Sequence, residues 1–270
     1  MDHNHIDDIT LAIAADRLRA LHVAGDPLVL VNAWDVASAR EVVAAGATAV
    51  GTSSAAIAAT LGEPDDNTMG LAHVFGVIRR IASAVPVPVT ADVEGGYDLD
   101  GVELVAALVA AGAVGCNIED SDHRRPGTLL DAATMADRLA DVRRAAKECG
   151  VDIVVNARID AMIRLDGDHR AVLAEIVRRA RTYAAAGADC VYPIGVGDPA
   201  TAAELVAEVG GPVNVNLGPG ITVAQMAAAG ASRISVGPTF HRRAMADLRE
   251  RAAELLGRPE GSGGALDAGE

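Results

Sequence analysis

Residues 108–120, Leu-Val-Ala-Ala-Gly-Ala-Val-Gly-Cys-Asn-Ile-Glu-Asp, join a helical pattern to an apolar run that ends in two acids. The phrase Ala-Ala-Gly-Ala within this stretch recurs at 44–47, 185–188 and 228–231, each time between a helical pattern and β-branched residues. Its glycine is typical of a helix end in the left-handed conformation, where the chain turns toward a strand. The repeated joint therefore predicts a repeating βα unit.

Eight runs are expected to form the strands: 28–32, 48–52, 87–91, 114–118, 153–157, 190–193, 213–216 and 233–236. Amphipathic stretches of helical length, such as 131–149 and 168–186, lie between them. Continuous apolar strands suit a parallel sheet that is buried on both faces. Eight βα units favour a closed (β/α)8 barrel of the TIM type over an open doubly wound sheet. The absence of Gly-x-Gly-x-x-Gly after the first strand weakens the dinucleotide-binding alternative.

We expect one α/β domain over residues 1–256, with an N-terminal helix at 7–23 across the barrel bottom and a disordered tail over 257–270. The formal net charge of −14 opposes binding to nucleic acid and to anionic membranes. No signal peptide and no membrane-spanning apolar run is apparent. The three cysteines are far apart, which argues against a disulfide framework. A soluble, cytoplasmic protein is expected.

Three carboxylates stand where two consecutive predicted strands end: Asp92 and Glu94 after the third strand, and Glu119 after the fourth. The carboxyl ends of barrel strands form one ring, and active sites lie there. Clustered acids repel one another unless a hard divalent cation holds them together, so they predict a Mg²⁺ site. Each acid taken alone has a simpler interpretation, as a helix N-cap or a partner in a loop salt bridge.

Other polar residues on the same ring predict an anion-binding site beside the metal. Arg158 follows the fifth strand and could bind a carboxylate bidentately, although it could also be a structural partner of Asp160. Ser53 and Ser54 follow the second strand and could hold an anion at a helix N-terminus, or could simply cap that helix. Trp34, as pocket wall or core, and Asn214 complete the expected substrate-binding set.

Taken together, several short motifs of this chain resemble one family. They are Asn32-Ala33-Trp34-Asp35, Gly51-Thr52-Ser53-Ser54, Thr90-Ala91-Asp92-Val93-Glu94-Gly95-Gly96-Tyr97, Asn117-Ile118-Glu119-Asp120, Asn156-Ala157-Arg158 and Gly218-Pro219-Gly220. In this order they resemble the isocitrate lyase / phosphoenolpyruvate mutase superfamily, from Leu28 to about Leu256.

The resemblance implies a barrel whose last helix swaps onto a neighbouring subunit, within a homo-oligomer that is a dimer or, more usually, a tetramer. It implies Mg²⁺ or Mn²⁺ held at Asp92, with Glu94 and Glu119 acting largely through metal-bound water. It places Ser53 and Ser54 on the substrate carboxylate or phosphonate, and Asp65 beside the metal and the substrate. Asp65 follows Pro64, so its alternative interpretation is a turn residue. Arg158 falls at the substrate-binding arginine of the family.

Two departures from the family pattern bear on the reaction. The lyase branch carries a catalytic cysteine in the loop after the fourth strand, whereas residues 121–128 contain none, so isocitrate or methylisocitrate cleavage is not expected. The mutase branch carries Asp-x-Asp-Thr-Gly-Tyr-Gly at the metal loop and a longer lid, whereas this chain has Asp92-Val93-Glu94-Gly95-Gly96-Tyr97 and a short, basic loop at 121–128, which argues against true mutase activity.

The leading hypothesis is a Mg²⁺-dependent lyase or decarboxylase that acts on a small α-keto or 2-hydroxy (di)carboxylic acid through a metal-stabilised enolate. His123 lies in the loop 121–128, which could close over an anionic substrate as a lid or could be a solvated loop, and it is the candidate for proton transfer. The first alternative is P–C bond chemistry of the carboxyphosphonoenolpyruvate or phosphoenolpyruvate phosphonomutase type. A phosphate-binding barrel enzyme that uses Gly218-Pro219-Gly220 and Gly237-Pro238, and a non-catalytic metabolite-binding barrel, also remain open.

Overall fold

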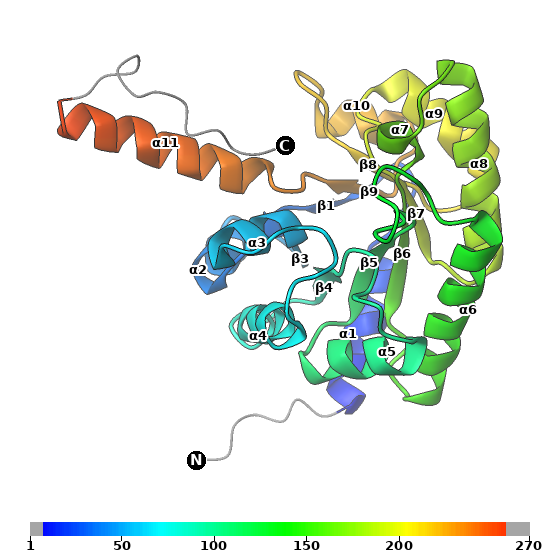
Figure 1. Ribbon diagram of the computed structural model, residues 1–270, viewed down its shortest axis with the longest axis horizontal. Helices are drawn as coiled ribbons and strands as arrows, with labels where there is room; N and C mark the ends of the chain where they lie inside the picture. The colour runs from blue at the N-terminus through cyan, green and yellow to red at the C-terminus, as the bar shows by residue number, and fades with distance from the viewer. Residues whose placement is uncertain (1–7, 258–270) are drawn as a thin grey trace.

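The computed structural model describes residues 8–257, and its parallel strands form a closed barrel surrounded by helices (Figure 1). The strands are β1 (Leu28–Leu30), β2 (Asn32–Ala33), β3 (Val50–Thr52), β4 (Val89–Asp92), β5 (Gly115–Glu119), β6 (Val154–Ile159), β7 (Cys190–Pro193), β8 (Asn214–Asn216) and β9 (Arg233–Ser235). Strands β2 to β7 pair in chain order, and β1, β9 and β8 form a second parallel sheet. A parallel bridge between Val191 and Val213 joins the two sheets. The predicted (β/α)8 barrel is confirmed.

The expected first strand, 28–32, is not continuous. Its first half, β1, pairs with β9, and its second half, β2, pairs with β3. The buried side chain of Asn32 bridges the gap, since its Nδ2 donates to the Thr52 carbonyl (2.7 Å) and its Oδ1 accepts from the Gly237 N–H (2.9 Å). The prediction of one strand was wrong because one run of chain pairs with a different neighbour in each half.

Helices alternate with the strands as predicted. They are α1 (Asp8–Ala20), α2 (Val36–Ala44), α3 (Ser54–Leu61), α4 (Leu71–Ala82), α5 (Gly101–Ala110), α6 (Ala132–Glu148), α7 (Ala161–Arg164), α8 (His169–Ala185), α9 (Pro199–Val209), α10 (Val223–Ala228) and α11 (Thr239–Leu255). The glycines of the four Ala-Ala-Gly-Ala phrases all have positive φ, between 77° and 104°. These joints therefore turn the chain as the sequence predicts.

Helix α1 closes the end of the barrel that is opposite to the predicted site. Leu18 is fully buried against Gly115, the first residue of β5. Arg19 donates from Nε to Asp189 (2.9 Å) and from Nη2 to the Asp152 carbonyl (2.6 Å), just before β7 and β6. Residue 7 of the expected N-terminal helix lies outside the described residues, as does all of the expected tail except Gly257.

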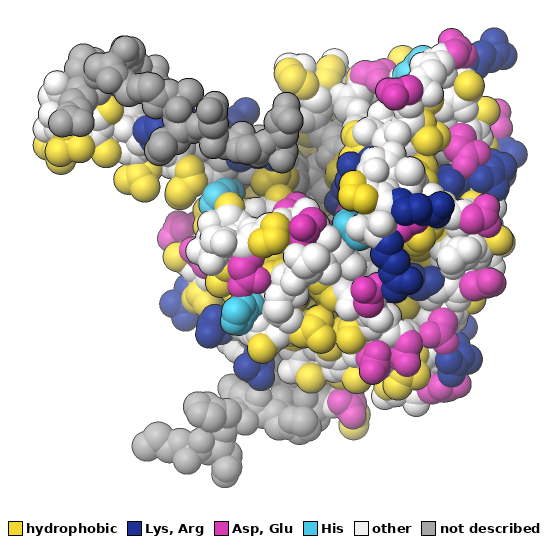
Figure 2. Space-filling view, viewed as in Figure 1, with side chains coloured by type: hydrophobic (Ala, Val, Ile, Leu, Met, Phe, Trp, Pro, Cys, Tyr) yellow, Lys and Arg dark blue, Asp and Glu magenta, His cyan; other side chains and the backbone are white. Residues whose placement is uncertain are grey.

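Helix α11 differs from the other long helices, because none of its residues is buried. It projects away from the barrel, and hydrophobic side chains line its lower edge in the view of Figure 2. Phe240, Met245, Leu248 and Leu255 are exposed, Leu255 by 89%. Within residues 8–257, no helix is long and apolar enough to cross a membrane.

Candidate active site

The three predicted acids lie at one end of the barrel because their strands are adjacent. Asp92 is the last residue of β4 and pairs in register with Asn117, two residues before Glu119 at the end of β5. The segment that follows β4 is also hydrogen-bonded to β5, since the Glu119 N–H donates to the Glu94 carbonyl (2.9 Å). Parallel pairing therefore brings Asp92, Glu94 and Glu119 to one edge, as the sequence predicts.

One oxygen of Asp92 is held at the start of α3, and the other has no hydrogen-bond partner within residues 8–257. Its Oδ2 accepts from the Ser54 hydroxyl (3.2 Å) and lies 3.5 Å from the Ser54 N–H. The Asp92 N–H donates to the Thr52 hydroxyl (3.0 Å). Burial raises the pKa of Asp92 to about 6, although Arg158 opposes the shift. Asp92 Oδ1 is buried and accepts no hydrogen bond from a described residue.

Glu94 follows Asp92 in a turn of unusual backbone geometry. Its φ is +50°, in the left-handed region, and its side chain is buried. Glu94 Oε2 accepts from the Asn67 N–H, whereas Oε1 is buried without a hydrogen-bond partner among the described residues. Burial raises the pKa of Glu94 to about 7, and the nearby charge of Asp65 adds to the shift. The Tyr97 hydroxyl lies close to the same carboxylate and opposes the rise in its pKa.

Glu119 lies between Arg158 and His123. Arg158 Nη1 is 2.7 Å from Glu119 Oε2, and His123 Nε2 is 2.9 Å from Oε1. Burial alone would raise the pKa of Glu119, but Arg158 and His123 together hold it below the usual value. In turn, the hydrogen bond to Glu119 raises the pKa of His123. His123 also packs tightly over Gly95, where an added Cβ would lie 2.9 Å from its ring.

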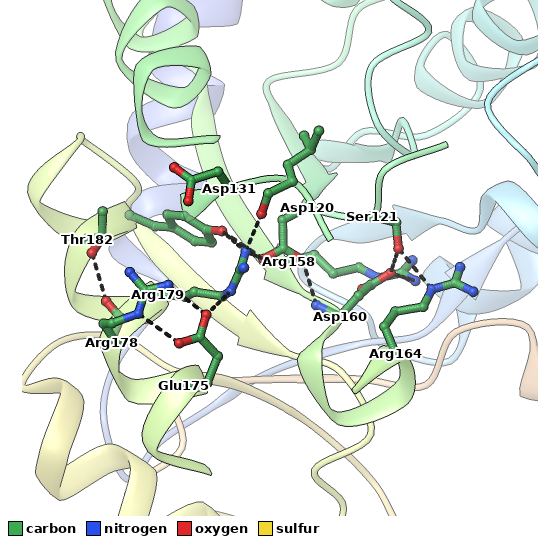
Figure 3. Close-up of polar contacts among 12 residues, drawn as sticks. Asp120, Ser121, Asp131, Arg158, Asp160, Arg164, Glu175, Arg178, Arg179 and Thr182 are labelled. Carbon is green, nitrogen blue, oxygen red and sulfur yellow. Dashed lines mark hydrogen bonds and ion pairs between the residues drawn. The ribbon is translucent and has the colours of Figure 1, made fainter. Parts of the chain in front are cut away.

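Arg158 is held from behind by Asp160, as Figure 3 shows. Its Nε and Nη2 donate to the two oxygens of the fully buried Asp160 (2.7 and 3.1 Å). The bidentate edge that the sequence assigned to a substrate carboxylate is therefore taken by Asp160, the alternative partner named there. Three of the five guanidinium N–H groups are engaged when Glu119 is included, which leaves one on Nη1 and one on Nη2.

A second buried carboxylate, Asp120, holds Asp160 in place (Figure 3). Asp120 Oδ1 accepts from the Asp160 N–H (2.8 Å). Its Oδ2 accepts from Arg179 Nη1 (2.9 Å) and from the Tyr183 hydroxyl (2.7 Å), and both donors lie on α8. Asp160 also accepts from the Ser121 hydroxyl (2.6 Å). Arg158 therefore rests on a network that reaches the outer helices.

Asp65 and the two serines lie on the β3 side of the acids. Asp65 is exposed as a residue, yet its carboxyl faces Ser54; desolvation raises the pKa of Asp65, and the Ser54 hydrogen bond opposes this. The hydroxyl of Ser54 thus serves both Asp65 and Asp92. Ser53 is the N-cap of α3, where its Oγ accepts from the Ala56 N–H (3.4 Å). The capping alternative therefore applies to Ser53.

Trp34 and Asn214 do not contact the acids through any described hydrogen bond. The half-buried Trp34 ring meets His241 of α11 edge-on, with ring centroids 5.1 Å apart. Asn214 is fully buried on β8 and donates from Nδ2 to the Ser235 hydroxyl (3.0 Å), while its Oδ1 has no described hydrogen-bond partner. Their expected substrate contacts stay predictions.

The residues present fit a divalent cation that keeps several of its waters better than one that is coordinated by protein side chains alone. Among residues 8–257, no three Asp, Glu, His or Cys side chains are close enough to form a metal site by themselves. However, Asp92 Oδ1 is a buried acceptor without a described partner, which is costly unless a cation or its water satisfies it, and the buried Glu94 carboxylate lies beside it. Mg²⁺ keeps several waters and needs only one or two protein carboxylates.

Two residues near the site were not singled out from the sequence. Asn67 contacts the turn that carries Glu94, through its backbone N–H and its side chain. Arg233 is fully buried in the barrel and donates from Nη2 to Asn117 (2.9 Å), without a carboxylate partner in the described region. A charged residue within a buried strand was the signal for Arg233. No local pattern connects Asn67 with Glu94.

Comparisons with known proteins agree with this arrangement. The family profile described as phosphoenolpyruvate phosphomutase matches residues 18–256. A Mycobacterium tuberculosis protein named uncharacterized protein Rv1998c is 36% identical over 221 residues, which cover 80% of each chain. The 2-methylisocitrate lyase of Salmonella typhimurium is 31% identical over 187 residues, 65% of this chain and 60% of that enzyme.

A solved structure from Burkholderia cenocepacia, named a candidate phosphonomutase, matches with a TM-score of 0.83 and 39% identity. The match covers 90% of this chain and 99% of that one. Barrel topology, the acids at the ends of β4 and β5, and a family match over nearly the whole chain agree. The chain belongs to the isocitrate lyase / phosphoenolpyruvate mutase superfamily of lyases and mutases.

Proposed function

We propose that the protein is a cytoplasmic, divalent-cation-dependent lyase that breaks a C–C bond next to the keto or hydroxyl group of a small carboxylic acid. Mg²⁺, or Mn²⁺ in its place, is the proposed cation. The observation that supports this most is the buried Asp92 Oδ1, which accepts no hydrogen bond from a described residue and lies beside the buried Glu94 carboxylate and a partly engaged arginine. A cation site beside an anion-binding cation suits a chelating α-keto or 2-hydroxy acid.

Asp92 and Glu94 would hold the cation, and Glu119 would bind one of its waters. When bound, the cation supplies Lewis acidity toward the oxygen next to the breaking bond. The two free N–H groups of Arg158 would bind the substrate carboxylate, and the Asp160 contact fixes the direction in which they point. This preset direction avoids reorganisation during the reaction.

His123 is the proposed proton donor to the carbon released by bond cleavage. Its Nε2 is 2.9 Å from Glu119, and this contact raises its pKa, so the ring keeps a proton to higher pH than a free histidine. Asp65, whose carboxyl faces Ser54, and Ser54 itself would bind the remaining polar end of the substrate. Trp34 and Asn214 are proposed to limit its size.

P–C bond chemistry is the second candidate, and two observations favour it. The Burkholderia cenocepacia structure named a candidate phosphonomutase matches the whole barrel. The loop at 121–128 also lacks the cysteine expected of isocitrate-type lyases. A phosphonate would use the same cation and the same Arg158 donors.

The test compares wild type, Asp92→Ala and Asp98→Asn on keto, hydroxy and phosphono acids. Asp98 is an exposed acid with a positive φ of 57° that asparagine tolerates, so Asp98→Asn is the matched control. We expect Mg²⁺-dependent release of a keto acid, lost at least 100-fold in Asp92→Ala and retained in Asp98→Asn. Full turnover in EDTA would reject the proposal, and a changed ³¹P NMR shift of a phosphonate would favour the second candidate.

We further propose that α11 packs on a second copy of the chain, as the resemblance implied. Its lack of buried residues and its exposed Leu248 and Leu255 support this. Light scattering should give a dimer or tetramer for wild type and a smaller species for Leu248→Asp. A monomeric wild type at micromolar concentration would contradict it.

A further inference from the structure

The loop that carries Asp65, residues 62–70 between α3 and α4, is fastened at its base. Glu63 Oε2 accepts from the Gly70 N–H (3.2 Å), and Glu63 Oε1 contacts His73 Nδ1 of α4. Met69 is buried in the hydrophobic core, with 3% exposure. These contacts close the loop on itself but do not connect it to the neighbouring strand ends.

Asn67, near the tip of this loop, makes that connection with two hydrogen bonds. Its backbone N–H donates to Glu94 Oε2, and its side-chain Oδ1 accepts from the Tyr97 N–H (2.8 Å). The same Oδ1 lies over Gly95, 3.3 Å from the position of an added Cβ. Asn67 therefore spans the turn 94–97 from its first residue to its last.

The turn that Asn67 spans is one that needs support. Glu94, Tyr97 and Asp98 are non-glycine residues with φ between +50° and +57°. Such residues persist in this region only where surrounding contacts hold them. From the other side, the Arg138 guanidinium packs against Gly96 and donates to the Leu99 carbonyl (3.2 Å). Asn67 and Arg138 thus both contact the turn 94–97 and hold its backbone in place.

We propose that Asn67 is a positioning residue, which fastens the Asp65 loop to the turn 94–97 and so presets the Glu94 carboxylate for the cation. The inference rests on the proposed function, because it assigns Glu94 to the cation. It also couples two acids that come from different strand ends: movement of the Asp65 loop displaces Glu94. A glycine at this position would fit the backbone equally well but could not make the side-chain bond.

This difference separates the proposed role from that of a simple turn residue. Asn67 has a φ of +66°, a conformation that asparagine and glycine both tolerate. Asn67→Gly therefore keeps the turn and the N–H bond to Glu94, and removes only the bond to Tyr97. Asn67→Asp keeps an acceptor for the Tyr97 N–H and therefore retains the side-chain bond that glycine removes.

The experiment measures Mn²⁺ binding to the full chain without substrate, by the electron paramagnetic resonance signal of free Mn²⁺, together with hydrogen exchange at the Tyr97 amide. We expect Asn67→Gly to weaken Mn²⁺ binding about fivefold to tenfold, as for the loss of one hydrogen bond, and to speed Tyr97 exchange. Asn67→Asp should retain the affinity and slow exchange of wild type. Both variants should melt within a few degrees of wild type.

Asp92→Ala, measured alongside, distinguishes failure of this inference from failure of the proposed function. If wild type binds no Mn²⁺, or Asp92→Ala binds it equally well, the cation site itself is refuted. If Asp92→Ala loses Mn²⁺ while Asn67→Gly keeps wild-type affinity and slow Tyr97 exchange, the cation site stands and the role of Asn67 is refuted.

Discussion

Replacement of Asp120 should destabilise the barrel more than any exposed acid does. Asp120 is fully buried and accepts three hydrogen bonds, from the Asp160 N–H, Arg179 and Tyr183. Asp120→Ala removes the acceptor of all three hydrogen bonds. The buried Arg179, which is 6% exposed, then keeps only one of its two carboxylate partners, Glu175. Breaking a buried ion pair on one side costs about 3–5 kcal/mol.

Asp120→Asn removes the negative charge of this side chain and keeps nearly the same volume, so it measures the contribution of the charge to stability. Its Oδ1 can still accept from the Asp160 N–H, but its amide would face Arg179 and the Tyr183 hydroxyl, which both donate at present. We expect a loss of about 2–3 kcal/mol in the free energy of unfolding, between those of wild type and Asp120→Ala. Asp120→Ala frees the segment that carries Asp160, so its turnover should fall as Arg158 loses its fixed direction. Asp120→Asn keeps the bond from the Asp160 N–H and should retain more of the turnover.

Urea unfolding measures this effect. With an m-value of about 3 kcal/mol/M, the midpoint of Asp120→Ala should fall by about 1 M or more. Asp137→Ala, at an exposed position of α6, is the control and should stay within about 0.5 kcal/mol of wild type. A midpoint for Asp120→Ala within about 0.2 M of wild type would refute the reasoning.

Two further predictions concern the opposite end of the barrel. Burial, reinforced by the charge of Arg233, lowers the pKa of His22 to about 4, so the unfolded chain binds the proton first as the pH falls. Stability should decrease from about pH 6.5 to pH 4, by up to about 3 kcal/mol, and urea midpoints of His22→Gln should depend less on pH. Asp189 accepts from Arg143, Arg19 and the Val155 N–H. Asp189→Ala should lower the free energy of unfolding by about 3 kcal/mol, and its Mn²⁺ affinity should equal that of wild type.

The barrel could be predicted from the sequence because the pattern that marks each βα unit is short and recurs along the chain. Each Ala-Ala-Gly-Ala phrase marks a helix end, and the four glycines have the positive φ that this requires. The break at Val31 could not be predicted, since it depends on which strand lies beside each half of one run. The sequence of α11 has the pattern of an ordinary amphipathic helix, so its lack of buried residues could not be predicted from that pattern.

The candidate site was predictable to the extent that it depends on strand ends. Asp92, Glu119 and Arg158 lie near one another because parallel strands end at a common edge. The Asp160 contact was foreseen as an alternative, since the two residues are neighbours in sequence. The bond from Tyr97 to Asn67 spans 30 positions between two loops, and no spacing rule reaches that far.

Strands within each sheet of the barrel pair continuously, whereas the contacts between the two sheets are less regular. Local opening of the barrel is therefore expected first at the seams between the sheets. Asp92, Glu119 and Arg158 all stand on the six-stranded sheet, where neighbouring strands pair continuously. Asn214 stands on the other sheet, which meets the first across the break at Val31 and at the seam between β7 and β8, where the Val191–Val213 bridge is followed by the bond from the Asn216 N–H to the Val196 carbonyl (2.9 Å). Amides at these seams should exchange with solvent before those of β5. An opening of these seams would move Asn214 relative to β5 and leave the strand pairing that spaces Asp92, Glu119 and Arg158 unchanged.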